Sequence, residues 1–230
     1  MKKYLWLLLP VILFAAITPF TPRLDVMISG FFYNADTGFF ARNRFFDAIY
    51  HYGLYPAWVV SLTALVGIFA SILIKSLRKY RKDMVFLVLA LAVGSGLIAN
   101  VIFKDHWGRP RPVQVVEFGG DHEFRPYYSP NLTFAVSPTK SFPSGHSTMG
   151  FYFFVLCFLG KRHKKHYLYL AGIVAVSIIG GMLGVTRIAQ GGHFFSDVIA
   201  AAMIMWYVAL IIDRLLYRGT KHERINQAST

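Results

Sequence analysis

The chain has 230 residues and a formal net charge of +13; 55% of its residues are hydrophobic, 17% are aromatic and only 15% are charged. A mean hydropathy of +0.47 is too apolar for an ordinary soluble domain, and the scarcity of charge excludes an intrinsically disordered chain. The single cysteine excludes a disulfide framework and a zinc ribbon. We therefore expect a membrane protein in which Cys157 is a small buried hydrophobic residue.

Six apolar stretches are long enough to cross or nearly cross a bilayer, because about 20 helical residues span about 30 Å of hydrocarbon. The first follows Lys2 and Lys3 as a secretory signal does, but no clean cleavage site follows it, so it is interpreted as a retained helix. The sequence predicts an all-α fold, a six-transmembrane helical bundle forming a single domain over residues 1–230. The predicted spans run from Tyr4 to Phe20, Leu54 to Ile74, Met84 to Phe103, Phe142 to Gly160, Tyr167 to Val185 and Phe194 to Tyr217.

Basic residues gather in every second connection between these stretches. The two chain ends and the connections after the second and fourth stretches hold 15 Lys and Arg residues against three acidic residues, whereas the rest of the chain holds nine against eight. The positive-inside rule places both termini and the basic connections in the cytoplasm. Loops at about 20–53, 104–141 and 186–193 are then outside the membrane. Topology accounts for the excess charge, so no nucleic-acid partner is expected.

The first outer loop is rich in aromatic side chains, which favour the headgroup region of a membrane. We expect residues 20–53 to lie on the membrane surface, either as an anchor or in contact with a substrate. The aromatic residues are Phe31, Phe32, Tyr33, Phe39, Phe40, Phe45, Phe46 and Tyr50.

The second outer loop opens with three closely spaced cations, Lys104, Arg109 and Arg111, at the end of the third stretch. Such cations repel one another unless an anion lies among them, and phosphate suits both the Arg fork and the Lys point charge. Snorkelling to the headgroups is the structural alternative. Arg109 either holds a loop or touches a second phosphate. His106 and Trp107 either contact substrate or anchor the chain at the interface.

The fourth stretch begins with Pro143-Ser144-Gly145-His146. Proline and glycine at a helix start allow backbone N–H groups to point at one anion, and the helix dipole adds favourable potential. His146 adds a group that donates a proton near neutral pH. A plain helix cap is the alternative meaning of this motif in isolation.

A third cluster lies between the fifth and sixth stretches, where Arg187 is followed by a glycine pair and by His193 and Asp197. The last two are four residues apart at the start of a helix, so they share one face. An Asp bonded to one imidazole nitrogen leaves the other nitrogen free to attack an electrophile. A structural His–Asp pair is the alternative. Because the three clusters lie at helix ends on one side of the membrane, we expect them to converge.

Together the three motifs resemble the type 2 phosphatidic acid phosphatase superfamily, which shares its site with vanadium-dependent haloperoxidases. The matching positions are Lys104-x6-Arg111-Pro112, Pro143-Ser144-Gly145-His146 and Arg187-x5-His193-x3-Asp197, with Thr186 where the family usually has Ser.

The resemblance implies an enzyme, a lipid phosphatase that needs no metal or other cofactor and that forms a phosphohistidine. In that scheme His193 attacks phosphorus, Asp197 orients it and His146 protonates the departing oxygen. The phosphate oxygens are bound by Lys104, Arg111, Ser144, the Gly145 amide and Arg187.

The stretches from Lys104 to Asp121 and from Gly180 to Val198 resemble bacterial lipid A 4'-phosphatases. This resemblance implies a bacterial inner-membrane enzyme that acts on lipid A or a related lipid phosphate at the periplasmic face, without an obligate protein partner. Undecaprenyl diphosphate, phosphatidylglycerol phosphate and phosphatidic acid stay open as substrates. A lipid phosphotransferase and an anion transporter are the alternative functions.

Overall fold

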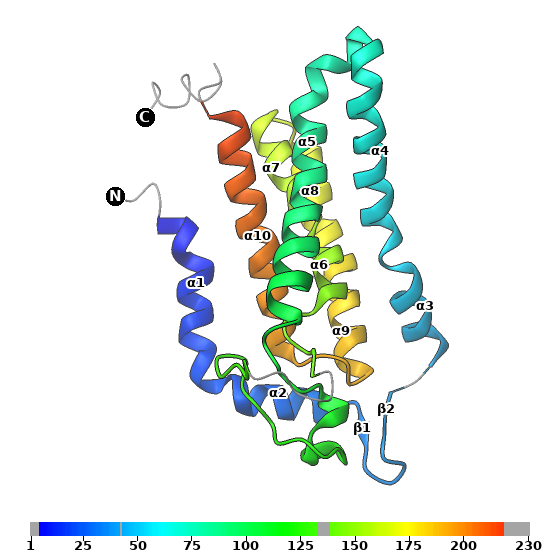
Figure 1. Cartoon of the computed structure of the whole chain (residues 1–230), viewed down its shortest axis with the longest axis vertical. Coiled ribbons are helices and arrows are strands. Elements are labelled where there is room, and N and C mark those ends of the chain that lie inside the picture. Colours follow the sequence, from blue (N-terminus) through cyan, green and yellow to red (C-terminus); the bar gives the residue numbers. More distant parts are fainter. Residues whose placement is uncertain (1–4, 42, 133–138, 219–230) are drawn as a thin grey trace.

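The computed structural model describes residues 5–41, 43–132 and 139–218. These residues form a helical bundle whose long helices stand roughly parallel, with a layer of shorter segments across one end (Figure 1). A single hairpin of two-residue strands is the regular sheet in the described part, so the all-α class is confirmed. The α-helices are α1 (Leu5–Ile17), α2 (Thr21–Gly30), α3 (Arg44–Tyr52), α4 (Tyr55–Leu73), α5 (Arg81–Leu89), α6 (Gly145–Phe151), α7 (Phe154–Arg162), α8 (His166–Ala175), α9 (Gly181–Ala189) and α10 (Phe195–Tyr217).

The remaining elements are short or differently wound. Two π-helical segments continue α-helices: η4 follows α5, and η7 joins α8 to α9. The strands pair antiparallel, with Tyr33 opposite Phe40. These elements are η2 (Thr18–Phe20), β1 (Tyr33–Asn34), β2 (Phe39–Phe40), η3 (Lys75–Tyr80), η4 (Ala90–Lys104), η5 (Pro112–Gln114), η6 (Val116–Phe118) and η7 (Val176–Gly180).

Within the described residues, five continuous helical runs are long and apolar enough to cross a membrane. Five of the six predicted spans overlap these runs, and the predicted start of the first, Tyr4, lies outside the described residues. The fourth prediction, Phe142 to Gly160, consists instead of α6 and α7, which meet at a turn at Tyr152 and Phe153. The runs are Leu7–Gly30, Arg44–Leu73, Lys75–Lys104, His166–Ala189 and Phe195–Tyr217. The count of six crossings is therefore not confirmed.

The interrupted pair α6–α7 lies inside the bundle. Apart from Met149, the buried positions of α6 are small or polar, including Ser147 and Thr148, whereas those of α7 are mainly apolar. Both helices contribute to a core shared with α5, η4 and α10. A segment surrounded by other helices contacts little lipid, so it needs neither the length nor the continuous apolar surface of a lipid-facing span.

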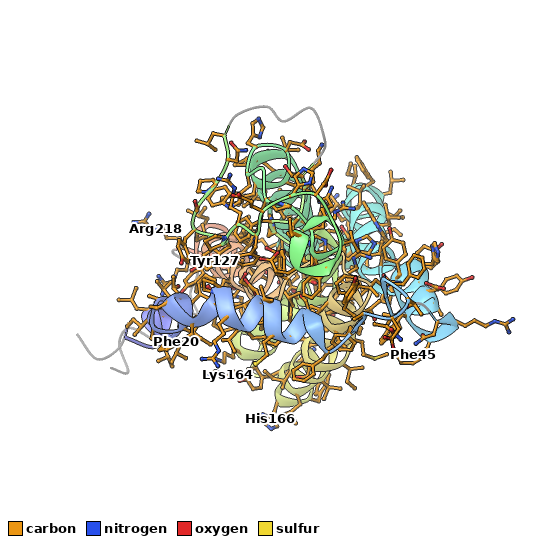
Figure 2. All side chains as sticks on the ribbon, turned by 90° about the horizontal axis from the view of Figure 1, so that it is seen from below. Phe20, Phe45, Tyr127, Lys164, His166 and Arg218 are labelled. Carbon is orange, nitrogen blue, oxygen red and sulfur yellow. The ribbon has the colours of Figure 1, made fainter. Side chains whose placement is uncertain are left out.

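The segment from residue 18 to residue 30 bends away from α1 and lies across the end of the bundle (Figures 1 and 2). Pro19 and Pro22 stand in the first turns of η2 and α2, where a missing N–H costs little and the chain changes direction readily. The buried face of α2 is polar: Thr21, Asp25 and Ser29 recur at four-residue intervals. This face packs on the start of α10.

The two ends of the molecule carry different connections. The start of α1, the end of α10 and the α4–α5 connection lie at the end farthest from α2 (Figure 1). There Arg162 binds Asp213 through two hydrogen bonds of 2.8 and 2.6 Å, and His163 lies 2.9 Å from Asp83. The basic connections therefore gather at one end, and the predicted phosphate-binding motifs lie at the other.

Close helix packing in the bundle depends on glycine. At Gly150 on α6, an added Cβ would lie 2.5 Å from the Cα of Gly180 on η7 and 2.7 Å from its nitrogen. Small residues allow membrane helices to approach closely and gain van der Waals contact.

We predict that Gly150→Ala destabilises the protein by about 1 to 3 kcal/mol, because backbone atoms of η7 must shift to admit the methyl group. Thermal unfolding in detergent, followed by size-exclusion chromatography, measures the effect. Gly181→Ala is the matched control, since an added Cβ there meets no atom within 4 Å. Equal unfolding midpoints for the two variants would contradict this packing argument.

Candidate active site

The predicted site residues lie where four helical segments end or begin. Lys104 is the last residue of η4, and Gly145 and His146 open α6. The backbone of Gly145 approaches η4 so closely that a Cβ there would lie 3.2 Å from Lys104 Nζ and 2.9 Å from Asn100 Oδ1. Glycine at position 145 therefore allows the start of α6 to lie directly against the lysine.

His146 lies at the centre of the predicted cations. It is within electrostatic range of Arg187, His193, Lys104 and Arg111, which come from α9, from the segment before α10, from η4 and from the loop after η4. The structure thus brings together five residues that the sequence places in three separate motifs.

Arg187 lies beneath the turn that leads to α10. An added Cβ at Gly192 would overlap the guanidinium of Arg187, and Gly191 has a φ of +64°. Glycine is needed at both positions, for space at Gly192 and for backbone conformation at Gly191. Arg187 Nη1 donates to Gln190 Oε1 over 2.7 Å.

Three buried polar atoms in this region have no hydrogen-bond partner among the described residues. They are Nε of Arg111, Nε of Arg187 and Oγ1 of Thr186. Buried donors are nearly always paired in folded proteins, so each unpaired donor needs an explanation. Acceptor oxygens of an anionic ligand are suitable partners for such donors, which makes the region a candidate anion site.

His193 is 1% exposed, and a hydrogen bond fixes its ring. Nδ1 lies 2.5 Å from the carbonyl oxygen of Ser141 and 3.8 Å from Asp197 Oδ2. Because a carbonyl only accepts, Nδ1 must carry the proton, and the lone pair is left on Nε2. The contact predicted between His193 and Asp197 is too long for a hydrogen bond, so Ser141 orients the imidazole directly.

Asp197 acts on His193 through Ser141. Its Oδ2 accepts from Ser141 Oγ at 2.6 Å and from the Phe194 amide at 2.8 Å. Asp197 stands in the first turn of α10, where unpaired backbone amides attract a carboxylate. The hydroxyl and carbonyl of one residue, Ser141, therefore connect this carboxylate to the imidazole.

Ser144, which the motif predicts as a phosphate ligand, caps α6. Its Oγ accepts from the Ser147 amide at 3.4 Å and lies 2.7 Å from Ser147 Oγ, and its side chain is fully buried. The cap fixes the first turn of α6, which presents the Gly145 amide near Lys104.

Arg109 is fully buried and forms the centre of a network that the sequence did not reveal. Its Nη1 donates to Asp197 Oδ1 at 2.5 Å and to Ser196 Oγ at 2.8 Å, and its Nη2 donates to Asp25 Oδ2 at 2.8 Å. Its Nε donates to the carbonyl of Arg125. The sequence left open whether Arg109 holds a loop or touches a second phosphate. The structure supports the first role, because Arg109 holds the loop that contains Arg125.

Asp25 is the residue that sequence reasoning missed. It comes from α2, and its Oδ1 and Oδ2 accept from the Ser196 amide and hydroxyl at 2.8 and 2.6 Å. The sequence contained one indication of its role: Asp25 shares a helical face with Thr21 and Ser29, which gives α2 a polar side.

Trp107 and His106 make contacts that favour anchoring. Trp107 Nε1 donates to the Tyr127 carbonyl at 2.7 Å, and its ring stacks on Phe142 with centroids 5.0 Å apart. His106 Nδ1 lies 3.0 Å from the Ile102 carbonyl. Among the described residues, no group of three His, Cys, Asp or Glu side chains is placed to hold a metal ion.

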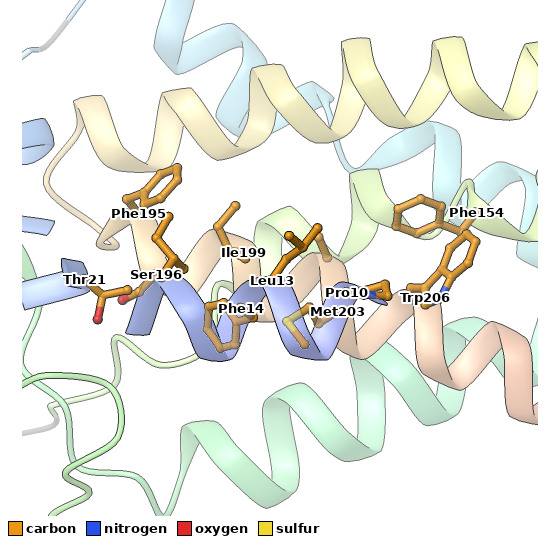
Figure 3. A pocket seen from close by; sticks show the side chains of 12 residues that line it. Pro10, Leu13, Phe14, Thr21, Phe154, Phe195, Ser196, Ile199, Met203 and Trp206 are labelled. Atoms are coloured by element: carbon orange, nitrogen blue, oxygen red, sulfur yellow. The ribbon is translucent and has the colours of Figure 1, made fainter. Parts of the chain in front are cut away.

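A groove of about 530 Å³ begins at the candidate site and extends along α4 and η4. Lys104, Gly145 and His146 line it near the site, and apolar side chains such as Leu62 and Val88 line it farther along the helices. A second cavity, of about 410 Å³, lies between α1 and α10 (Figure 3). This second cavity is lined almost wholly by apolar side chains and by none of the predicted site residues, so of these two cavities the first connects to the candidate site.

Comparison with known families identifies the class of protein. A family model described as "PAP2 superfamily" matches residues 83–221, more than half of the chain. The protein therefore belongs to the PAP2 superfamily, as its motifs indicated, and is a lipid phosphatase.

Individual relatives narrow the comparison. A protein of Francisella tularensis subsp. novicida named "Lipid A 4'-phosphatase" is 35% identical over 205 residues, covering 87% of this chain and 90% of the relative. A Rhizobium etli protein with the same name is 33% identical, covering 59% of this chain and 49% of the relative. A "Lipid A 1-phosphatase" of Rhizobium johnstonii is 37% identical, covering 51% of this chain and 42% of the relative. No solved structure matches. The helices and these relatives together identify a bacterial membrane protein.

The buried network around Arg109 yields a prediction on stability. Arg109→Met leaves Asp25 and Asp197 as two buried carboxylates without their cation, which we expect to cost about 3 to 5 kcal/mol. Thermal unfolding in detergent measures the loss. Lys140→Met is the control, because the Lys140–Asp105 pair (2.7 Å) is exposed and should contribute little. If both variants unfold at the wild-type temperature, the network does not stabilise the fold.

The burial of His193 yields a prediction on pH. Desolvation lowers the pKa of His193 to about 4 from an ordinary value of 6.5, although the neighbouring Asp197 acts in the opposite direction. The unfolded chain then binds a proton more readily than the folded protein does, so the contribution of His193 to stability is complete above pH 6.5 and is lost as pH falls towards 4.

We expect wild type to lose up to about 3 kcal/mol more than His193→Asn between pH 7 and pH 4. Unfolding midpoints over that range measure the difference. The Asn amide retains a donor near the position of Nδ1 but does not titrate. Identical pH dependence in the two proteins would show that His193 is not buried as a neutral group.

Proposed function

We propose that this lipid phosphatase hydrolyses a phosphate monoester on lipid A or a closely related lipid, through a phosphohistidine on His193 and without a metal ion. The observation that carries the proposal is the set of buried, unpaired donors on Arg111, Arg187 and Thr186 beside two imidazoles. Phosphate supplies the acceptor oxygens that these groups lack.

The arrangement supports in-line displacement at phosphorus. The Ser141 carbonyl accepts a hydrogen bond from His193 Nδ1–H, so the lone pair lies on Nε2 and attacks phosphorus while the bond to the lipid oxygen breaks. His146 donates a proton to the departing oxygen. Lys104, Arg111, Arg187 and the Gly145 amide hold the phosphoryl oxygens, since phosphoryl transfer depends chiefly on positioning and charge stabilisation. Water then attacks the phosphohistidine, with His146 as base.

The substrate class is proposed from the groove and the relatives. The apolar groove between α4 and η4 begins at Lys104 and His146, so an acyl chain lying there would present its phosphate to the cations. The Francisella relative that aligns over nearly its whole length is named for the 4'-phosphate of lipid A. The groove supports a lipid substrate, and the name of the relative favours lipid A over undecaprenyl diphosphate, phosphatidylglycerol phosphate and phosphatidic acid.

The orientation of the protein is proposed from its charge. The basic connections, the start of α1 and the end of α10 lie at the end of the bundle opposite the candidate site. The positive-inside rule then places the termini in the cytoplasm and the site at the periplasmic face of the inner membrane.

The proposal predicts phosphate release by the detergent-purified enzyme in the presence of EDTA. Lipid A phosphorylated only at the 4' position should react faster than lipid A phosphorylated only at the 1 position, and faster than the other lipid phosphates. His193→Asn should lower kcat/KM by at least about 10³-fold, and Arg187→Met by about 10²- to 10³-fold, as for loss of an oxyanion-hole donor.

Arg23→Met is the matched control, because it removes an exposed cation of α2 outside the proposed site. Activity that survives in His193→Asn would refute the phosphohistidine scheme. Added acceptor lipid that captures the phosphate would indicate a phosphotransferase. Phosphate uptake into proteoliposomes without hydrolysis would indicate a transporter.

A further inference from the structure

The aromatic helix α3 contacts His146 of the candidate site through the side chain of Tyr50. The ring of Tyr50 stacks on the imidazole of His146, with centroids 4.4 Å apart and planes inclined by 16°. Tyr50 is half-buried in the last turn of α3, which exposes other aromatic residues such as Phe45 and Tyr52. In the part of the chain that the structure describes, no hydrogen bond fixes the His146 ring, so this stack sets its plane.

The same ring also contacts a cation of the site. The guanidinium carbon of Arg187 lies 4.8 Å from the centroid of Tyr50. A second connection runs from α3 to the same arginine: Gln190 donates to Asp47 Oδ1 at 3.2 Å and accepts from Arg187 Nη1 at 2.7 Å. Helix α3 is therefore joined to Arg187 both through a ring face and through a hydrogen-bonded chain.

The charges around His146 make an aromatic face useful there. The groups that face it are Arg187, His193, Lys104 and Arg111, which are cations or imidazoles. An electron-rich ring face attracts a cation, by about 0.5 to 2 kcal/mol. Stacking with Tyr50 holds the plane of the imidazole, and the same ring attracts the guanidinium of Arg187.

We propose that Tyr50 is a positioning residue that holds His146 as proton donor to the leaving oxygen and holds Arg187 against the phosphate. The proposal rests on the function proposed above and adds an aromatic residue from the outer loop, outside the three motifs. The sequence left open whether residues 20–53 anchor the chain at the membrane or contact substrate. Under this proposal, Tyr50 gives that loop a function at the site in addition to anchoring.

The test compares leaving groups. An alkyl or sugar oxygen departs only with a proton, whereas nitrophenolate departs without one, so loss of the acid slows the first far more than the second. Tyr50→Leu removes the ring, Tyr50→Phe keeps it, and Tyr52→Leu is a control with the same substitution on an exposed position of α3. Size-exclusion profiles and unfolding temperatures show that each variant is folded.

We expect Tyr50→Leu to lower kcat/KM for the lipid phosphate by about 2- to 30-fold, with a smaller loss for a nitrophenyl phosphate. Tyr50→Phe and Tyr52→Leu should behave as wild type. Binding of inorganic phosphate, followed by phosphorus NMR without turnover, should weaken in Tyr50→Leu alone, because Arg187 loses its support.

Equal losses for the two leaving groups, or a loss that Tyr50→Phe reproduces, would overturn the positioning role of the ring. Unchanged phosphate binding in Tyr50→Leu would overturn its connection to Arg187. Failure of the function itself is distinguishable, since His193→Asn would then be as active as wild type whatever the Tyr50 variants show.

Discussion

The structure depends on one buried guanidinium. Arg109 is shielded from water and bridges Asp25 on α2 to Asp197 on α10, and its Nε holds the loop carbonyl of Arg125. Burying two carboxylates is costly unless a cation and further hydrogen bonds satisfy them, so these segments fit together in only a few ways. Asp197 accepts a hydrogen bond from the Ser141 hydroxyl, and the Ser141 carbonyl accepts one from His193 Nδ1. The network that joins α2 to the bundle therefore also fixes the imidazole.

The sequence predicted the helical class and the convergence of the motifs well, because both follow from simple constraints. An apolar stretch must cross as a helix, and residues at alternate ends of consecutive spans must meet at one face. It could not predict that Ser141, from a distant part of the chain, would form hydrogen bonds with both His193 and Asp197. The four-residue spacing allows contact, but a carboxylate in a first helical turn also satisfies backbone amides, and here it accepts from Phe194. The imidazole then bonds to the Ser141 carbonyl.

Two other features escaped prediction because their causes are tertiary. Asp25 lies in an aromatic segment with no motif around it, and only its burial against Arg109 and Ser196 reveals its importance. The predicted fourth span was read as one helix from its hydropathy, yet it breaks at Tyr152 and Phe153. Hydropathy measures tolerance of an apolar environment, and a segment enclosed by other helices has that environment without needing to be continuous.

The short run from Lys104 to Arg111 shows why residue type alone could not sort the cations of this protein. Arg109 meets two carboxylates, so its charge is compensated within the fold. Arg111 instead keeps a buried Nε without a hydrogen-bond partner among the described residues, and Lys104 lies against the first turn of α6 beside the groove. An arginine already neutralised by carboxylates attracts phosphate weakly, whereas an uncompensated cation at a dry helix end attracts it strongly. Two residues therefore separate a cation that maintains the fold from one that is available to a ligand, and only the positions of Asp25 and Asp197 in three dimensions distinguish them.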